Sequence, residues 1–430
     1  MKSSFLSALC LAAASPAVDA AGMLKATRAA AGFHDIKTTN YVPMRRHESS
    51  TPSTLLHKRA LTRPTNLTNV HDVYYIIDLV VGNQTIPVSI DTGSSDTWLV
   101  QEPYDCVSFF WPIPGQPLDC GLGKGFVGPL SGGNITSHYF GRAYMDGTFV
   151  QGFFGYEDVS IGGLTAKHQQ LALVNYTFWQ GDGRTSGLLG LGYPYMTSLD
   201  GPEENMPAYD PVFTTMWKDK LIDPVFSIAL SRSNEATPQH GQADEESYLA
   251  LGGLPPVELD DKTWARSEIQ GINAIPEWQF ETKEKGLYII TPEGWVIDGN
   301  KNATANTTAT FPILIDVGST LSILPKSVVN PLYAAFDPPA VYLSSTGLFY
   351  AQCNATVPKF GVEIGGKPFY FAPEDLLRQT VRDKSGEYCR IGVTDVNSGP
   401  YVLGVSWLTS VVAVFDIQNS EMRFASRNKY

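Results

Sequence analysis

Two short acidic segments with one shared pattern stand 225 residues apart in this 430-residue chain. The first is Val88-Ser-Ile-Asp91-Thr92-Gly93-Ser94-Ser95, and the second is Ile313-Leu-Ile-Asp316-Val317-Gly318-Ser319-Thr320. Each has an apolar run typical of a strand, followed by Asp, a variable residue, Gly and Ser. One copy can be an ordinary turn, because Asp and Gly are common turn residues. Chance produces the pattern about 0.01 times in a chain of this composition, so two copies indicate a common function.

The residue types in the two turns favour one kind of chemistry. Gly permits close backbone approach, and the small hydroxyl residue after it can hydrogen-bond the carboxylate. If the turns meet, Asp91 and Asp316 lie side by side, and repulsion leaves one proton between the two carboxyl groups. The charged carboxylate can then act as a base on water while the protonated one donates to a carbonyl oxygen. This predicts hydrolysis of an amide without a metal, a cofactor or a nucleophilic side chain.

Composition narrows both the fold and the partners. Hydrophobic residues make up 43% of the chain and charged residues 17%, which excludes a disordered chain. The net charge of −12 argues against binding to nucleic acid. Apolar runs punctuated by Gly and Pro predict a mostly β fold. The expected strands lie at Tyr74–Val81, Ile86–Ile90, Phe226–Leu230, Tyr248–Leu251, Leu287–Ile290 and Val411–Phe415, with a strand pair in Phe149–Ile161 and helices at Pro325–Ala335 and Phe371–Gln379.

The first 59 residues are expected to be a leader rather than part of the final fold. Residues 1–20 combine Lys2, an apolar run and small residues up to Ala20, a pattern typical of a secretory signal peptide. Residues 21–59 carry seven basic and two acidic side chains and end in the dibasic site Lys58-Arg59. Residues 60–430 carry 23 basic and 40 acidic side chains. We therefore expect a prosegment that docks electrostatically and is loosened by acid. A disordered N-terminus without an inhibitory role is the alternative.

The cysteines fit a secreted protein. Cys10 lies in the signal peptide, and the four that remain are an even number, which predicts disulfides. Local closure favours Cys106–Cys120 and Cys353–Cys389. The other two pairings, which would cross the whole chain, stay open. No C-x-x-C motif supports a zinc or redox centre.

Sequons for N-glycosylation occur along the whole chain. In a secreted protein they indicate surface loops that can carry glycans. They begin at Asn66, Asn83, Asn134, Asn175, Asn302, Asn306 and Asn354. The two at Asn302 and Asn306 predict an exposed, glycosylated insertion.

Further motifs surround the two acidic turns. They are Asp91-Thr-Gly-Ser-Ser-Asp-Thr-Trp-Leu-Val100, Tyr144-Met-Asp-Gly-Thr148 followed by Gly155-Tyr-Glu-Asp-Val159, Gly187-Leu-Leu-Gly-Leu-Gly-Tyr-Pro194, Tyr401-Val-Leu-Gly404 and Val414-Phe-Asp416. Together they resemble the pepsin-like aspartic proteases of the fungal secreted type, over residues 72–428. The segments are similar, in order, to the family's first active-site motif, its flap hairpin, the apolar loop behind the first Asp, and its C-terminal signature. The two local cysteine pairs also fall where the family often has disulfides.

The resemblance implies a role for each matching residue. Asp91 and Asp316 would be the catalytic pair, with Ser94 and Ser319 hydrogen-bonding the outer carboxylate oxygens. Tyr144 would close over the substrate, with the Trp98 indole as its hydrogen-bond partner. The implied support residues are Thr92, Gly93, Ser94, Trp98, Val317, Gly318, Ser319 and Thr320, and the implied flap residues are Tyr144, Met145, Asp146, Gly147 and Thr148. Phe178 or Trp179 is expected to line a pocket beside the scissile bond.

Four positions depart from the family pattern. Val317 stands where the second motif usually has Thr, whose hydroxyl would grip the opposite loop. Met145 replaces the usual flap Gly. Ser186 and Val405 each stand where Asp is common. None of these removes a catalytic carboxylate, so we expect hydrolysis to survive.

Other enzyme classes find little support in the sequence. There is no G-x-S-x-G for a serine hydrolase, no H-E-x-x-H for a metalloprotease, and no Rossmann context for the Gly-rich runs. A catalytically weak or inactive peptide-binding protein on the same fold is the alternative that Val317 and Met145 favour.

The sequence thus predicts a mostly β, bilobal, pepsin-like acid protease fold. Its two β-barrel-like lobes would span residues 60–224 and 225–430, with a substrate cleft between them. The expected protein is an aspartic endopeptidase, made as a zymogen, monomeric, and free of cofactor, metal, nucleic acid and membrane anchor. Its partners would be its own prosegment and extended peptides. It would be secreted, with a vacuolar destination as the alternative.

Overall fold

A computed structural model describes residues 37–48, 73–107, 120–198, 207–232, 247–298 and 305–427. Residues 38–430 form one unit, separate from residues 1–37, and the fold is that of the larger unit. The predicted signal peptide, Lys58-Arg59 and the sequons at Asn66 and Asn302 lie outside the described residues.

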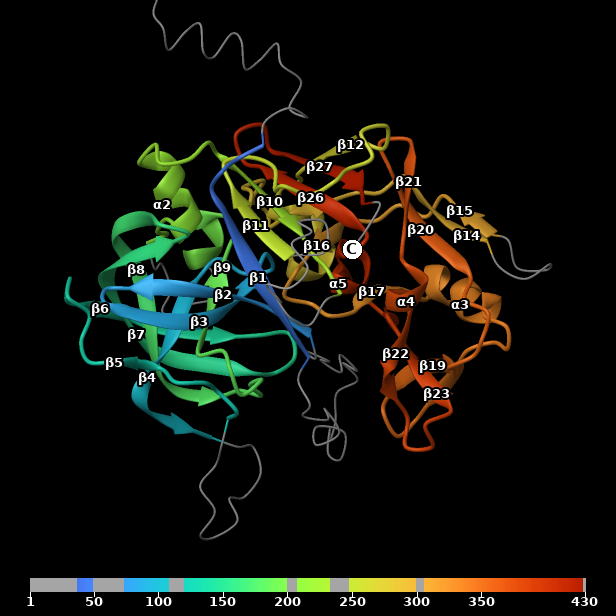
Figure 1. The fold of residues 1–430 in the computed structure, drawn as a ribbon, viewed down its shortest axis with the longest axis horizontal. Coiled ribbons are helices and arrows are strands. Elements are labelled where there is room, and N and C mark those ends of the chain that lie inside the picture. Colours follow the sequence, from blue (N-terminus) through green and yellow to red (C-terminus); the bar gives the residue numbers. More distant parts are fainter. Residues whose placement is uncertain are drawn as a thin grey trace, which may run out of the picture. The chain divides into compact units, whose positions relative to one another are not determined.

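One long sheet connects the two lobes of the larger unit (Figure 1). Its strands are β1 (Tyr41–Glu48), β2 (Val73–Val81), β3 (Gln84–Asp91), β4 (Thr97–Cys106), β5 (Phe126–Val127), β6 (Asn134–Ala143), β7 (Phe149–Ile161), β8 (Leu164–Phe178), β9 (Gly187–Gly190), β10 (Val225–Ala229), β11 (Ser247–Leu251), β12 (Ala265–Glu268), β26 (Val411–Asp416) and β27 (Glu421–Ser426). Their order is β12-β27-β26-β10-β11-β1-β2-β3-β9-β4-β8-β7-β6, with β5 beside β4. Strands β2 to β9 build the first lobe.

Three smaller sheets build the second lobe (Figure 1). The first contains β13 (Ile289–Ile290), β16 (Ile313–Ile315), β25 (Tyr401–Leu403), β17 (Ser322–Pro325) and β24 (Val393–Val396). The second contains β15 (Ala305–Thr307), β14 (Gly294–Asp298), β20 (Lys359–Ile364) and β21 (Lys367–Tyr370), and the third β18 (Val341–Leu343), β19 (Leu348–Gln352), β23 (Tyr388–Ile391) and β22 (Leu377–Arg382). The fold is therefore mostly β and bilobal, as predicted.

Each lobe repeats the same small arrangement of three strands around its Asp turn. In the first lobe, β3 runs parallel to β9, and β9 pairs antiparallel with β4. In the second, β16 runs parallel to β25, and β25 pairs antiparallel with β17. The Asp turn connects β3 to β4 in one lobe and β16 to β17 in the other. The duplication seen in the sequence is thus a duplication of supersecondary structure.

Strand β1 comes from the expected prosegment, yet it is part of the long sheet. It pairs antiparallel with β11 through Tyr41–Met44 and with β2 through Arg45–Glu48. Figure 1 shows it in dark blue between these two strands. Eight residues of the expected prosegment therefore supply backbone hydrogen bonds to the sheet that connects the lobes.

The helices are few and short, and one of the two expected helices is confirmed only in part. They are α2 (Val212–Lys218), α3 (Lys326–Ala335), α4 (Pro373–Leu376) and α5 (Val405–Leu408), with 3₁₀ turns η3 (Pro194–Ser198), η5 (Ile272–Ala274) and η6 (Pro276–Trp278). The helix expected at Pro325–Ala335 is confirmed as α3. In Phe371–Gln379 only α4 is helical, and the chain then enters β22, which pairs with β23. Phe149–Ile161 is one long strand, β7, rather than a pair.

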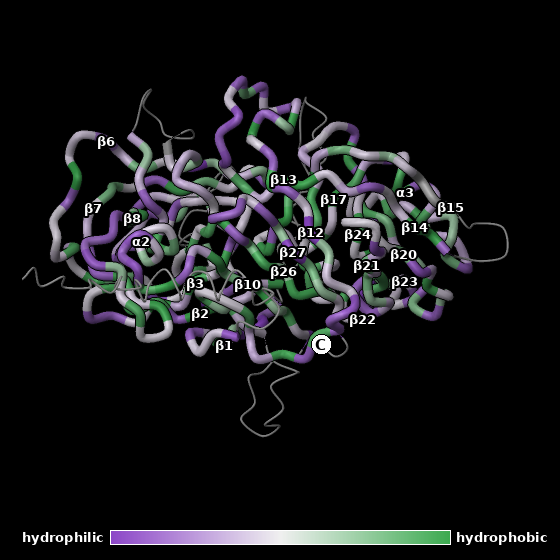
Figure 2. The backbone as a smooth tube through the Cα atoms, turned by 90° about the horizontal axis from the view of Figure 1, so that it is seen from above, coloured by the Kyte–Doolittle hydropathy of each residue, from purple (hydrophilic) through white to green (hydrophobic). Residues whose placement is uncertain are grey.

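The core lies along the inner strands, and β10 and β26 are buried at every position. In Figure 2 the hydrophobic stretches run through the inner strands, including β10 and β26, while polar residues follow the outer loops. The largest fully buried side chains include Trp98, Trp295, Trp407 and Phe226. Within the part of the chain that the structure describes, no helix is long and apolar enough to cross a membrane.

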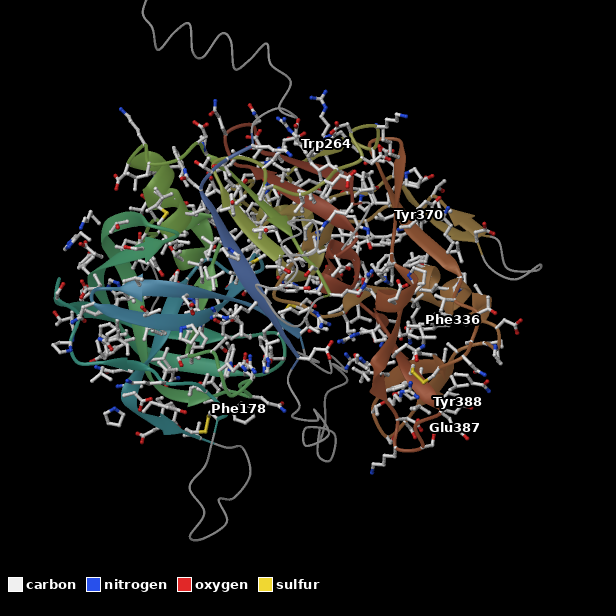
Figure 3. The ribbon with its side chains drawn as sticks, in the orientation of Figure 1. Phe178, Trp264, Phe336, Tyr370, Glu387 and Tyr388 are labelled. Atoms are coloured by element: carbon white, nitrogen blue, oxygen red, sulfur yellow. A yellow bond between two sulfur atoms is a disulfide. The ribbon has the colours of Figure 1, made fainter. Side chains whose placement is uncertain are left out.

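The disulfides are those favoured by local closure. Cys106 pairs with Cys120, and Cys353 pairs with Cys389. Figure 3 shows the first beside Phe178 and the second beside Glu387 and Tyr388. The sequon residues Asn83, Asn134, Asn175 and Asn354 are all exposed, and Asn306 lies in β15.

Candidate active site

The two Asp turns meet at one cavity. Asp91 is the last residue of β3, and Asp316 directly follows β16. Both line a cavity of about 370 Å³, together with residues of the flap and of the second lobe. Asp91 is buried and Asp316 is half-buried, so neither carboxyl group is fully hydrated.

The glycines of the two motifs let the loops approach one another. A Cβ atom placed on Gly93 would lie 2.8 Å from Cγ of Asp316, and one on Gly318 would lie 2.5 Å from Oδ1 of Asp91. Each glycine therefore faces the carboxyl group of the other lobe. Any side chain at either position would push the two carboxyl groups apart.

Hydrogen bonds to the two carboxyl groups are unequal. Asp91 accepts the Gly93 backbone N–H at Oδ1 (2.7 Å) and the Ser94 hydroxyl at Oδ2 (2.5 Å). Asp316 accepts the Gly318 backbone N–H at Oδ1 (2.8 Å). The Ser319 hydroxyl does not match its expected role, because it donates to the Leu321 carbonyl oxygen (2.9 Å).

The electrostatics assign different protonation states to the pair. Desolvation in the cavity, then the charge of Asp91 and a hydrogen bond to it, hold the pKa of Asp316 well above its ordinary value. The backbone N–H groups of Gly318 and Gly93 oppose this shift but are weaker causes. Burial and the neighbouring carboxylate therefore favour the protonated form of Asp316, and Asp91 accepts the larger number of hydrogen bonds.

Thr92 joins the two Asp turns. Its buried hydroxyl donates to the Ile315 carbonyl oxygen (2.9 Å) and accepts the Val317 backbone N–H (3.0 Å). Val317 lies at the symmetrical position and has no hydroxyl with which to reciprocate. Thr320 instead reaches the first lobe, where its hydroxyl accepts the Val73 backbone N–H (3.2 Å).

The flap is the hairpin between β6 and β7, and it covers the cavity. Tyr144 and Thr148 close it through a backbone hydrogen bond (2.8 Å), and Gly147 takes a positive φ of 85° at its tip. The carboxylate of Asp146 accepts both the hydroxyl and the N–H of Thr148. Tyr144, Met145 and Asp146 line the cavity, and the Met145 side chain remains 47% exposed.

Tyr144 is held by two tryptophans. Trp98 donates its indole N–H to the Tyr144 hydroxyl oxygen (2.7 Å). The Trp179 ring packs edge-on against both Tyr144 and Trp98. Burial, followed by the charge of Asp91, raises the pKa of Tyr144, so the phenol stays protonated. Of the two aromatics expected at the pocket, Trp179 lines it, whereas Phe178 packs against Phe149.

Several residues of the site escaped the sequence analysis. Asp96 and Arg142 form a buried ion pair in the cavity wall. Trp278 and Phe280, from the segment between β12 and β13, also line the cavity. Asp96 lies within the first motif, but nothing in the pattern indicates its partner, 46 residues away. Among the described residues, no group of three or more His, Cys, Asp or Glu side chains could hold a metal ion.

Comparisons with known proteins agree with this geometry. The sequence profile of the family described as eukaryotic aspartyl protease matches residues 74–427. The chain belongs to the eukaryotic aspartyl protease family. Membership makes it a hydrolase of the aspartic-type endopeptidase class, as the resemblance implied.

The chain is also similar in sequence to aspartic proteases of several fungi. A protein of Aspergillus fumigatus, named as a probable aspartic-type endopeptidase, is 35% identical over 363 residues, which cover 82% of this chain and 79% of that protein. Penicillopepsin-1 of Talaromyces stipitatus is 26% identical, covering 84% and 81% of the two chains. Aspergillopepsin-1 of Emericella nidulans is 26% identical, covering 86% and 82%.

Proposed function

We propose that this member of the family is a secreted endopeptidase that hydrolyses proteins at acidic pH through Asp91 and Asp316. The observation that carries the proposal is the unequal setting of the two carboxyl groups. Asp91 accepts a hydroxyl and a backbone N–H, while burial and the neighbouring charge raise the pKa of Asp316. One charged and one protonated carboxyl group are what acid–base hydrolysis by an aspartic protease needs.

The reaction then follows from these protonation states. Charged Asp91 takes a proton from a water molecule, whose oxygen attacks the peptide carbonyl carbon while Asp316 gives its proton to the carbonyl oxygen. A neutral tetrahedral diol results. Asp91 passes its proton to the amide nitrogen as the C–N bond breaks, and a diol hydroxyl returns a proton to Asp316. Both carboxyl groups end as they began, and no covalent enzyme intermediate forms.

The substrate is a peptide in extended conformation. Flap residues Tyr144, Met145 and Asp146 line the cavity. The residues of the second lobe that line it include the apolar Leu287, Leu314 and Ile323. An extended peptide satisfies its backbone through the flap and places side chains in pockets along such a groove.

Processing and destination complete the proposal. We infer that residues 21–59 are a prosegment cut at Lys58-Arg59, and that the lobes divide near Pro224. The part of this prosegment that forms β1 lies in the sheet, and none of the described residues that line the cavity comes from β1.

Two disulfides and four exposed sequon asparagines support secretion with glycans. We infer a monomer.

The test compares the secreted full-length protein with Asp91→Asn, Asp316→Asn and the surface control Asp261→Asn. Hydrolysis of a denatured protein is measured from about pH 3 to about pH 7, with and without a statine-type inhibitor. We expect acid-side activity that falls about 100- to 10,000-fold in the first two variants only. A folded wild type that binds the inhibitor but cuts nothing would instead make it a peptide-binding protein on this fold.

A further inference from the structure

A buried ion pair lies in the cavity wall beside the flap. Arg142 donates from Nε to Oδ2 of Asp96 (2.5 Å) and from Nη2 to Oδ1 (3.2 Å), a two-pronged contact. The side chains are only 6% and 5% exposed, and both residues line the cavity. No role for this pair follows from the dyad chemistry.

The position of the pair relates it directly to the flap tyrosine. Arg142 stands two residues before Tyr144, and Asp96 stands two residues before Trp98, the indole partner of Tyr144. The contacts Asp96–Arg142 and Trp98–Tyr144 are therefore two successive links between the same two segments. One segment leaves the Asp91 turn, and the other leads into the flap. Because the two links follow one another along both segments, they fix the position and the direction of the end of β6 that leads into the flap, here called the flap root.

Further contacts hold the pair against the loop behind Asp91. Arg142 donates from Nη2 to the Thr197 carbonyl oxygen (2.7 Å) and from Nη1 to the Gly141 carbonyl oxygen (2.8 Å). The Tyr209 hydroxyl donates to Oδ1 of Asp96 (2.5 Å). The guanidinium also lies 5.3 Å from the centre of the Phe140 ring. The pair therefore connects the flap strand β6 to the Asp91 turn and to η3.

A buried ion pair is a poor source of stability, because desolvation of the charges offsets much of their attraction. What such a pair does provide is a fixed geometry, because the planar guanidinium fits a carboxylate in only a few orientations. Tyr144 must close over a bound peptide within a fraction of an ångström to contribute to catalysis. A rigid charged link at the flap root meets that need.

We propose that Asp96 and Arg142 are positioning residues that hold the flap root so that Tyr144 closes over the catalytic carboxyl groups. The proposal rests on the proposed function only in assuming that the flap closes over a peptide-like ligand. The pair acts through Tyr144, so its effect on ligand binding must depend on that side chain.

The experiment is a double-mutant cycle between the pair and Tyr144 in the full-length protein. The pair variant Asp96→Asn/Arg142→Gln removes both charges but preserves volume and hydrogen-bonding groups, so it avoids leaving one buried charge alone. It is made in the wild-type and the Tyr144→Phe backgrounds. Arg142→Lys tests the guanidinium shape, because it keeps the charge and loses the fork. Thermal midpoint, affinity for a statine-type inhibitor, kcat and KM are measured for each.

We expect the pair variant to remain folded and to weaken inhibitor binding and kcat/KM about tenfold in the wild-type background. In the Tyr144→Phe background it should change them less than about threefold, and Arg142→Lys should rescue only part of the loss. The matched control is Asp416→Asn/Arg423→Gln, which removes the 2.9 Å ion pair that buried Asp416 of β26 forms with half-buried Arg423 of β27. The control should change stability without changing inhibitor affinity.

Two results would overturn the proposal. One is an equal loss in both backgrounds, which would make the pair a structural element only. The other is a folded pair variant with wild-type inhibitor affinity, kcat and KM. If the wild type bound the inhibitor without cutting substrate, the proposed function would fail, yet the inhibitor affinities would still decide whether the pair positions the flap.

Discussion

At the scale of single residues, matching motif positions take on different tasks in the two lobes. Ser94 and Ser319 both follow the glycine of an Asp turn, yet only Ser94 donates to its carboxylate. Thr92 and Val317 both follow the Asp, yet only Thr92 can connect the loops through a side chain. The site is therefore symmetrical in its backbone and unsymmetrical in its side-chain hydrogen bonds.

The serines provide a matched test of that asymmetry. Ser94→Ala removes a hydrogen bond to the Asp91 carboxylate. Because this hydroxyl positions the carboxylate that we propose as the base, kcat/KM should fall about tenfold. Ser319→Ala should leave kcat/KM unchanged, because its hydroxyl bonds a backbone carbonyl. The measurement is kcat/KM for both variants, and equal losses would contradict the assignment.

The raised pKa of Asp316 makes a prediction about stability. The folded chain keeps a proton on Asp316 that the unfolded chain releases near its ordinary pKa of about 4. Wild-type stability must therefore decline as the pH rises from there through the raised pKa. Asp316→Asn cannot ionise, so we expect it to exceed the wild type in stability at neutral pH, with a difference that shrinks toward pH 4. Urea unfolding at several pH values measures this, and a difference independent of pH would contradict it.

At the scale of elements, neighbours decide what the local pattern leaves open. Phe371–Gln379 has helical residues, yet its second half becomes β22 because β23 offers a hydrogen-bonding edge. Strand β1 has the composition of a basic leader, yet it fills the space between β11 and β2. Backbone pairing with distant strands outweighs local propensity in both cases.

The contact between the two Asp turns is also an element-scale feature and has its own test. Thr92→Val leaves the Ile315 carbonyl oxygen and the Val317 N–H without their hydroxyl partner. It should lower the free energy of unfolding by about 1–3 kcal/mol. Val317→Thr should restore the second half of the grip and raise stability or shift the acid limb. Urea unfolding and the pH profile measure both variants, and a Val317→Thr protein unchanged in each would refute this account of Val317.

At the scale of the whole molecule, the two lobes share a sheet but each has its own disulfide. Cys106–Cys120 closes a loop of 14 residues and Cys353–Cys389 one of 36. In the chain-entropy account a longer closed loop restricts the unfolded state more. The covalent links therefore stabilise the second lobe more than the first.

Removing each disulfide in turn tests this difference. The variant Cys353→Ala/Cys389→Ala should lose about 4 kcal/mol, and Cys106→Ala/Cys120→Ala about 3 kcal/mol. Denaturant unfolding of the two variants gives the comparison. A larger loss from the shorter loop would show that native packing around the disulfide, rather than loop entropy, sets its contribution.

The sequence by itself predicted the mostly β class and favoured the two disulfides that the structure contains. These depend on a local pattern or a count, and such signals survive without coordinates. The two lobes were implied by the family resemblance, and the catalytic role of Asp91 and Asp316 stays a prediction. The sequence also placed Trp98 and Tyr144 together through the family resemblance, and the structure joins them at 2.7 Å.

Only the tertiary structure decided the place of β1 in the sheet and the ion pair between Asp96 and Arg142. These depend on which segments meet after folding, and their sequence separations reach 209 residues for Tyr41 and Ala250. A buried charge in particular cannot be foreseen locally, because its existence depends on a partner from another strand that offsets the cost of desolvation.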